Sequence, residues 1–364
     1  MKWPQAILSF AREPSARFAA RMDTEALLAN IREGSLSQDK ARALTADELA
    51  ARNASGNTVL HTAAKYGRLR DLNPAVLTAE LFSLKNDSGY TPLHQLAFGG
   101  HFGQLPAGLL SRSHFLVRSN SGYTPLHTAA AAGTLAQVPA AVGAINHELL
   151  LIRTDLGNTL LHEAAETGAL DRLPPNLLSE RLLAERNLSG ETVLHVAALN
   201  GHLGQIPNAW LGTSVLLRTT KAGDTVLHAS AISGHLGQVP PELLISNNLL
   251  LKSKAGYSVL HAVAETGQLD RIPAGILTAE LLLTRNEHGD TPLHAAAYEG
   301  HLGQIPASIL TPALLATRNY EGVTPLATAV RRGNVGQLPV ALRPVEPGIV
   351  KRTLIKWGLS RPPF

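Results

Sequence analysis

The sequence predicts an all-α repeat solenoid, because three features recur together at one fixed spacing along most of the chain. A histidine, a glycine and a proline return about every 33 residues. Such a period is typical of arrays in which each unit is one supersecondary element that packs only against its neighbours. We therefore expect a single array of helix-turn-helix units, joined by short hairpin-like turns, with the second helix of each unit split or shortened.

The histidine marks the repeat most clearly. It follows a Ser or Thr by three residues, and its column advances by 33 residues in seven of eight intervals. The longer interval contains the sequence GAIN at residues 143–146, which we interpret as a two-residue insertion. The column consists of His61, His94, His127, His162, His195, His228, His261 and His294, with Ala327 in the last copy.

Three further columns follow the same spacing. A glycine lies six residues after every histidine position, from Gly67 to Gly333, and a proline lies twelve residues after it in eight copies, from Pro106 to Pro339. A Lys or Arg lies nine residues before it in eight of nine copies, and Thr219 is the exception.

The period, the Ser/Thr-x-Leu-His core, the Ala-Ala and Gly after it and the Asn-x-x-Gly turn before it resemble ankyrin repeats. The resemblance covers nine copies over residues 53–343. Residues 22–52 align as a degenerate copy without the histidine and the proline, and we expect them to cap the N-terminal end. A basic amphipathic segment at residues 1–21 and a basic capping segment at residues 344–364 complete the predicted organisation.

The histidine column is predicted to be structural. In a capping box the residue three positions after the Ser or Thr cap reaches back to the cap backbone, and histidine can take that place. A shared metal is the alternative, but helices pack about 8–10 Å apart, too far for successive histidines to share zinc at bonds of about 2 Å. We expect no catalytic residue, no metal and no cofactor.

The proline column distinguishes these units from the usual ankyrin pattern, in which a second helix runs through that position. Proline inside a helix costs about 3 kcal/mol and forces the preceding residue toward extended geometry. Ser or Thr five residues later, as at Thr311, can cap another short helix. The sequence thus predicts a helix, a turn, a one-turn helix and a short helix before the next hairpin turn.

Composition restricts the remaining classes. The chain has no cysteine, which excludes disulfides and thiolate chemistry, and no apolar run approaches the roughly 18 residues of a membrane span. The net charge is +4, but residues 53–330 hold 17 basic and 20 acidic residues, whereas residues 331–364 hold seven and one. The basic column fits cations at helix C-termini better than a nucleic-acid stripe. We expect a cytoplasmic monomer.

The resemblance implies that a partner contacts the turn tips and the exposed side of each first helix. These positions vary from copy to copy while their neighbours stay constant. The candidate partner-binding residues are Lys65, Tyr66, Tyr90, Phe98, Tyr123, Glu166, Tyr257, Glu265, Asp290, Tyr298, Glu299 and Arg331. The early aromatic residues favour a binding site, since tyrosine is enriched among binding anchors, although packing against neighbouring turns explains them equally well.

The expected function is therefore a non-enzymatic scaffold that binds a protein through the concave face of the solenoid. One alternative is a bacterial effector or inhibitor module that blocks a target enzyme, which would share every feature above. Another is docking of the basic C-terminal tail to nucleic acid or an anionic membrane.

Overall fold

The computed structural model describes residues 24–139, 145–173 and 178–343. This part contains helices and turns without a β-strand, and its only extended pairing is isolated bridges such as Arg52 with Thr58 at the base of a turn. None of its helices is long and apolar enough to cross a membrane. The predicted all-α repeat architecture is confirmed. The predicted terminal segments 1–21 and 344–364 lie outside the described residues.

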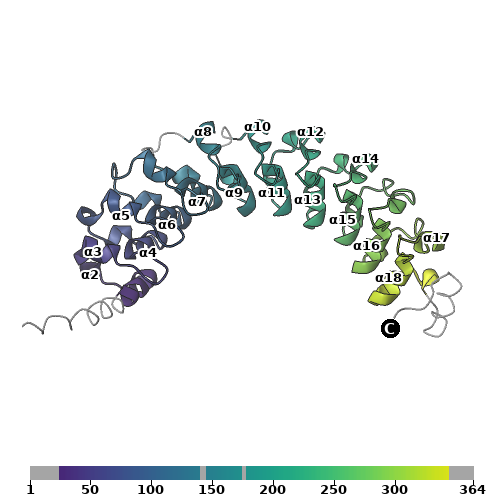
Figure 1. Cartoon of the computed structure of the whole chain (residues 1–364), viewed down its shortest axis with the longest axis horizontal. Helices are drawn as coiled ribbons and strands as arrows, with labels where there is room; N and C mark the ends of the chain where they lie inside the picture. Colours follow the sequence, from purple (N-terminus) through teal and green to yellow (C-terminus); the bar gives the residue numbers. More distant parts are fainter. Residues whose placement is uncertain (1–23, 140–144, 174–177, 344–364) are drawn as a thin grey trace, which may run out of the picture. The chain divides into compact units, whose positions relative to one another are not determined.

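The chain divides into two compact units, residues 1–179 and residues 180–364. In unit 1, the first helices α4, α6, α7 and α9 pack side by side in chain order (Figure 1). A helix at 24–33, α2 (Gln38–Ala43) and α3 (Ala46–Ala50) precede them. The remaining bounds of this unit are α4 (Val59–Lys65), α5 (Ala79–Ser83), α6 (Pro92–Gly99), α7 (Pro125–Ala131), α8 (His147–Leu150) and α9 (Leu160–Thr167).

Unit 2 repeats the arrangement with first helices α11, α13, α15, α16 and α18, each packed on the next (Figure 1). Its helices are α10 (Glu180–Leu183), α11 (Val193–Leu199), α12 (Thr213–Leu216), α13 (Val226–Ile232), α14 (Ser246–Leu249), α15 (Val259–Glu265), α16 (Pro292–Glu299), α17 (Pro312–Leu315) and α18 (Pro325–Arg332).

The first helix of each repeat is short and fixed at both ends, as α16 illustrates. Thr291 is its N-cap and Pro292 occupies the first position, where a missing N–H removes no helical bond. Gly300 ends the helix in the left-handed conformation at φ +86°, which an L side chain rarely adopts. Leu293, Ala296 and Ala297 are fully buried, so the helix face packs into the core.

The second half of each repeat is split, as the proline column predicts. After α16 comes a 3-10 turn, Leu302–Gln304, then Pro306 and a hydrogen-bonded turn, and then α17. The Thr311 hydroxyl caps α17 by accepting the Leu314 N–H at 3.3 Å. The sequence predicted a turn before the proline and a one-turn helix after it, whereas in this repeat the 3-10 turn precedes Pro306 and a simple turn follows it. The 3-10 turn forms because Leu302 is fully buried while the following proline cannot continue a helix.

Neighbouring repeats are joined by backbone and side-chain hydrogen bonds. At the turns, the Asp87 N–H donates to the Ser55 carbonyl at 3.2 Å, and corresponding bonds recur in both units. In the 3-10 turns, the Gln104 amide donates to the Gly67 carbonyl at 2.9 Å and accepts the Leu69 N–H at 3.0 Å. The sequence pattern contains this glutamine, but its role depends on a contact between repeats.

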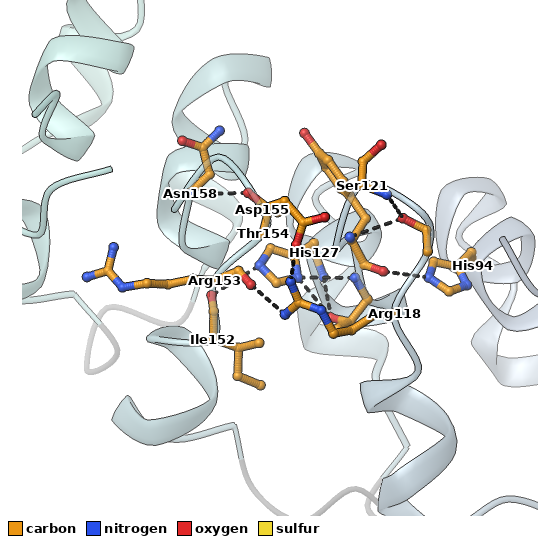
Figure 2. A network of polar contacts seen from close by, with 12 residues as sticks. His94, Arg118, Ser121, His127, Ile152, Arg153, Thr154, Asp155 and Asn158 are labelled. Carbon is orange, nitrogen blue, oxygen red and sulfur yellow. Dashed lines mark hydrogen bonds and ion pairs between the residues drawn. The ribbon is translucent and has the colours of Figure 1, made fainter. Parts of the chain in front are cut away.

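The basic column also joins repeats. Figure 2 shows Arg118, whose guanidinium donates to the Arg153 carbonyl at 2.8 Å and to the Asp155 carboxylate at 2.6 Å in the next turn. Arg285 likewise donates to the carbonyls of Gly289 in its own turn and Arg318 in the next. The sequence interpretation, a cation at a helix C-terminus, missed these direct bonds to the turn carbonyls.

Candidate functional site

The column histidines, together with the helix starts and turns that they join, form the constant part of each repeat. We call this part the frame, and the variable residues lie on its surface. In all eight, Nδ1 accepts the backbone N–H of the Ser or Thr cap, at 3.0–3.3 Å. In six, Nε2 lies 2.9–3.1 Å from a backbone carbonyl of the following repeat, as in His61 with Tyr90. In His127 it lies 3.1 Å from the carbonyl of Ile152, just before the next turn. Each of these histidines thus ties a helix start to the next turn.

These bonds define the protonation state of the ring. Nδ1 must be unprotonated to accept an N–H, so the proton is on Nε2, which donates to the carbonyl. Burial lowers the pKa of His61, His94, His127 and His261 to about 4, and it also lowers the pKa of His195, His228 and His294. Within the described ranges no cluster of His, Asp and Glu could hold a metal ion.

In unit 1 the structure brings four predicted residues into one groove. Lys65, Tyr90, Phe98 and Tyr123 line a depression of about 270 Å³ between the turn tips and the first helices α4, α6 and α7. The tyrosine rings rest edge-on against histidines of the frame, since the Tyr90 and His94 ring centroids are 5.1 Å apart at 89°. Packing therefore holds one side of these rings, while the other side lines the groove.

The rim of this groove is formed by an exposed aromatic and a cation. Phe98 is 61% exposed, and the Lys65 ammonium lies 5.5 Å from its ring centroid and 5.6 Å from that of Tyr66. Tyr66 itself lines a neighbouring depression beside the helix at 24–33. This part of the surface is aromatic and positively charged, and the described residues that line the groove include no carboxylate.

Sequence reasoning missed Glu163 at the next position along unit 1. This carboxylate on α9 is only 3% exposed and accepts a hydrogen bond from the Asn158 amide at 3.0 Å. Burial raises the pKa of Glu163, and it also raises that of Tyr123, whose hydroxyl interacts with this carboxylate. The predicted residue Glu166 is exposed one turn further along α9 and adds to the negative charge. The signal was an acidic residue directly after a column histidine.

In unit 2 the other six predicted residues share a second groove. Its volume is about 360 Å³, and α15, α16, α18 and three turns form it. It contains Tyr257, Glu265, Asp290, Tyr298, Glu299 and Arg331. The Tyr257 hydroxyl donates to the Glu265 carboxylate, and the Asn319 amide donates to Asp290 at 2.7 Å. The acidic residues make this groove unlike the one in unit 1.

The geometry defines the chain as a helical repeat protein in which a constant frame carries variable grooves. The family model for the ankyrin repeat matches residues 288–309, which include a turn tip, α16 and the 3-10 turn after it. The same unit recurs along the described chain, so the match at one copy and the repeated architecture together support an ankyrin-repeat protein. No curated protein gave a match to the sequence.

Proposed function

We propose that this protein is a non-enzymatic scaffold that binds another protein through the grooves between its turn tips and first helices. Ankyrin repeats generally mediate protein–protein interaction. One observation carries the proposal here: ten of the positions that vary from copy to copy line the two grooves, and the constant histidines beneath them are themselves buried. The repeats keep the same buried residues but differ in the side chains that line the grooves, which is the pattern expected of a surface that recognises one particular partner.

The groove of unit 1 has the properties of a binding surface. Phe98 exposes most of its ring beside Tyr90 and Tyr123, and large aromatic side chains dominate the energy of protein interfaces. Burying such a ring against a partner gains roughly 25 cal/mol for each Å² removed from water. The groove is open to solvent, so a segment or a loop of another protein can enter it.

The chemistry of the frame argues against catalysis by the column histidines. Nδ1 of each histidine is engaged by its cap, and in seven of them Nε2 is engaged by a backbone carbonyl, so neither nitrogen of these seven rings faces a substrate. A general base needs a free nitrogen within hydrogen-bond reach of a substrate proton and a pKa near the working pH. Burial lowers the pKa of these rings away from that range.

The test is affinity capture with the intact chain, followed by affinity measurements on the purified partner. We expect the double variant Lys65→Ala/Phe98→Ala to weaken binding by about tenfold or more, since anchor residues each contribute at least about 1 kcal/mol. Tyr90→Ala/Tyr123→Ala should abolish binding. Thermal melts accompany each variant, so that lost binding is separated from unfolding.

The matched control is Leu156→Ala, which removes an equally exposed apolar side chain, 66% exposed, from a turn of the same unit outside the groove lining. We expect it to bind as the unchanged protein does. Equal binding by the control and by both groove variants would reject this surface.

The consequence of binding is a separate question. A protein that brings partners together and an inhibitor that blocks an enzyme would use the same surface, and an activity assay on the captured partner distinguishes them. Docking of residues 344–364 to nucleic acid or an anionic membrane stays a prediction, because that segment lies outside the described residues. Vesicle and DNA binding by the full chain and by a chain lacking these residues tests it.

A further inference from the structure

The grooves of the two units occupy corresponding positions in their repeats but carry opposite charge. Lys65 and Tyr90 of unit 1 correspond to Glu265 and Asp290 of unit 2, and Phe98 corresponds to Tyr298. The frame beneath them is the same, because a histidine clasp joins each helix to the next turn in both units. The difference therefore resides in the side chains that a partner would meet.

The groove of unit 2 has an excess of negative charge. Glu265, Asp290, Glu299 and Glu321 line it together with one cation, Arg331. A second arginine, Arg332, lies beside it with its guanidinium carbon 3.4 Å from the centroid of the Tyr298 ring. Four carboxylates thus face two guanidinium groups, so the local field favours a cation.

Within the part of the chain that the structure describes, these carboxylates have no basic ion-pair partner. The side chains of Glu299 and Glu321 make no hydrogen bond in that part of the chain. Glu265 and Asp290 are instead oriented by neutral donors, the Tyr257 hydroxyl and the Asn319 amide. These donors fix the carboxylates in place while leaving their charge uncompensated.

The aromatic part of the groove suits a guanidinium in particular. Tyr298 is 50% exposed and already stacks with Arg332, which shows that its ring accepts a planar cation. A guanidinium can also donate two parallel bonds to one carboxylate, which an ammonium cannot. A segment that carries arginine therefore matches both the charge and the shape of the surroundings better than a neutral or acidic one.

We propose that the groove of unit 2 binds an arginine-bearing segment of a partner protein, with the guanidinium between the carboxylates of Glu265, Glu299 and Glu321 and beside Tyr298. This inference rests on the proposed protein-binding function and names the chemistry of the partner at one of its grooves. The groove of unit 1, with Lys65 and without a carboxylate, takes a different part of the partner.

The experiment selects ligands without assuming a partner. A random peptide library is panned against the full-length protein, and the selected peptides are synthesised for affinity measurement. We expect arginine to be enriched in them, with lysine less favoured. Replacing the arginine by citrulline, which keeps the shape but not the charge, should weaken binding by about tenfold or more. Binding should also fall when salt rises from about 0.05 M to about 0.5 M.

Two charge-matched variants locate the site. Glu265→Gln/Glu299→Gln/Glu321→Gln keeps the hydrogen-bond acceptors and should weaken the arginine peptides by about tenfold or more. Glu242→Gln/Asp270→Asn/Glu280→Gln removes the same charge from exposed positions outside the groove lining and should change the affinity by less than about twofold. Thermal melts check that both variants remain folded.

Selection of peptides without arginine enrichment would overturn the inference, and so would an equal loss of affinity in the two variants, which would show an unspecific effect of net charge. Neither outcome rejects the proposed function, because that proposal is tested by Lys65→Ala/Phe98→Ala in the other unit. Conversely, Lys65→Ala/Phe98→Ala and Leu156→Ala could bind the captured partner equally while the arginine peptides still require the three glutamates. That result would reject the proposed surface of unit 1 and support the arginine site of unit 2.

Discussion

A single residue, the column histidine, links the local fold to its pH dependence. Its Nδ1 can accept the cap N–H only when it carries no proton, so protonation would remove the bond that starts the helix. Burial acts in the same direction by disfavouring the charged ring. The folded protein therefore binds these protons more weakly than the unfolded chain does.

Stability is expected to fall as the pH decreases from about 6.5 to about 4. The folded pKa of His61, His94, His127 and His261 is about 4, below the ordinary value of 6.5. In this pH window the unfolded state holds more protons than the folded state, so the free energy of unfolding rises with pH. The contribution of these histidines to that free energy is complete above pH 6.5. Each such histidine accounts for roughly 3 kcal/mol, and a domain has only about 5–15 kcal/mol in total.

Chemical denaturation at a series of pH values measures this effect. The variant His61→Gln retains a side-chain acceptor at the capping position but cannot be protonated, so it should reduce the slope of stability against pH by about one proton. A stability that stays constant between pH 7 and pH 5 would contradict the assignment of the neutral tautomer.

Glu163 is the other residue whose charge matters for the fold. Its pKa is raised by burial, so the folded state holds its proton more tightly than the unfolded state does, and ionisation destabilises the fold as the pH rises through the folded pKa. Glu163→Gln should therefore raise the melting temperature at neutral pH by a few degrees. Glu166→Gln removes the same charge from an exposed position of α9 and should have a smaller effect. An unchanged or lower melting temperature for Glu163→Gln would show that ionised Glu163 supports the fold.

At the scale of elements, the shortness of each helix follows from the residues at its ends. The helix α13 begins after its cap residue, Thr225, whose capping partner is the column histidine His228. Gly234 lies just beyond the end of the helix at φ +82°. The 3-10 turn Leu236–Gln238 and the proline at residue 240 then prevent a second long helix. Each element is defined by a local rule, but none is long enough to be stable alone.

Two glycines of this repeat separate backbone conformation from packing. A Cβ added at Gly234 or at Gly237 would meet no atom within 4 Å, but only Gly234 has a positive φ. Gly234→Ala should therefore lower the free energy of unfolding by about 1–2 kcal/mol, whereas Gly237→Ala should leave it unchanged or raise it by up to about 1 kcal/mol. Urea denaturation of both variants provides the comparison. Equal effects would mean that the left-handed conformation is not what Gly234 supplies.

At the scale of the molecule, stability in a repeat array is approximately the sum of the terms between neighbours. The basic column supplies one such term, since Arg186 of unit 2 donates to the Gly190 carbonyl at 2.7 Å and to the Thr219 carbonyl in the next repeat. The sixth copy, with the exposed Thr219 in that column, has no side chain that can reach these acceptors. We therefore expect the contact of this copy with the next one to be weaker than that of its neighbours.

Thr219→Arg should strengthen that contact by adding bonds to the carbonyls of Gly223 and Lys252. We expect a gain of about 0.5–2 kcal/mol in the free energy of unfolding. Thr219→Lys should gain less, because Lys85 and Lys252 donate to the next repeat alone. Thr219→Met, which lengthens the side chain without a donor, serves as the control. If Met stabilises as much as Arg, packing and not hydrogen bonding explains the column.

The sequence alone predicted the repeat, the helix starts and the split second helix. These depend on local rules: a Thr cap three residues before a histidine, a glycine beyond the helix end and a proline that stops a helix, as at Thr291, His294 and Gly300. Local geometry is determined by residues that are close in the chain, and the same local pattern occurs in nine copies of the repeat. The sequence also identified the columns that vary.

Only the tertiary structure decided how those columns combine. Tyr90, Phe98 and Tyr123 come from two repeats, and the contact of Lys65 with Phe98 crosses from one repeat to another. The bonds of Gln104 and Arg118, and the burial of Glu163, likewise depend on the neighbouring repeat. The repeat period identifies which residues occupy corresponding positions in different repeats. The distance between side chains in adjacent repeats, however, is determined by packing of the core. The sequence therefore determined the frame, and packing between repeats determined the grooves and their charge.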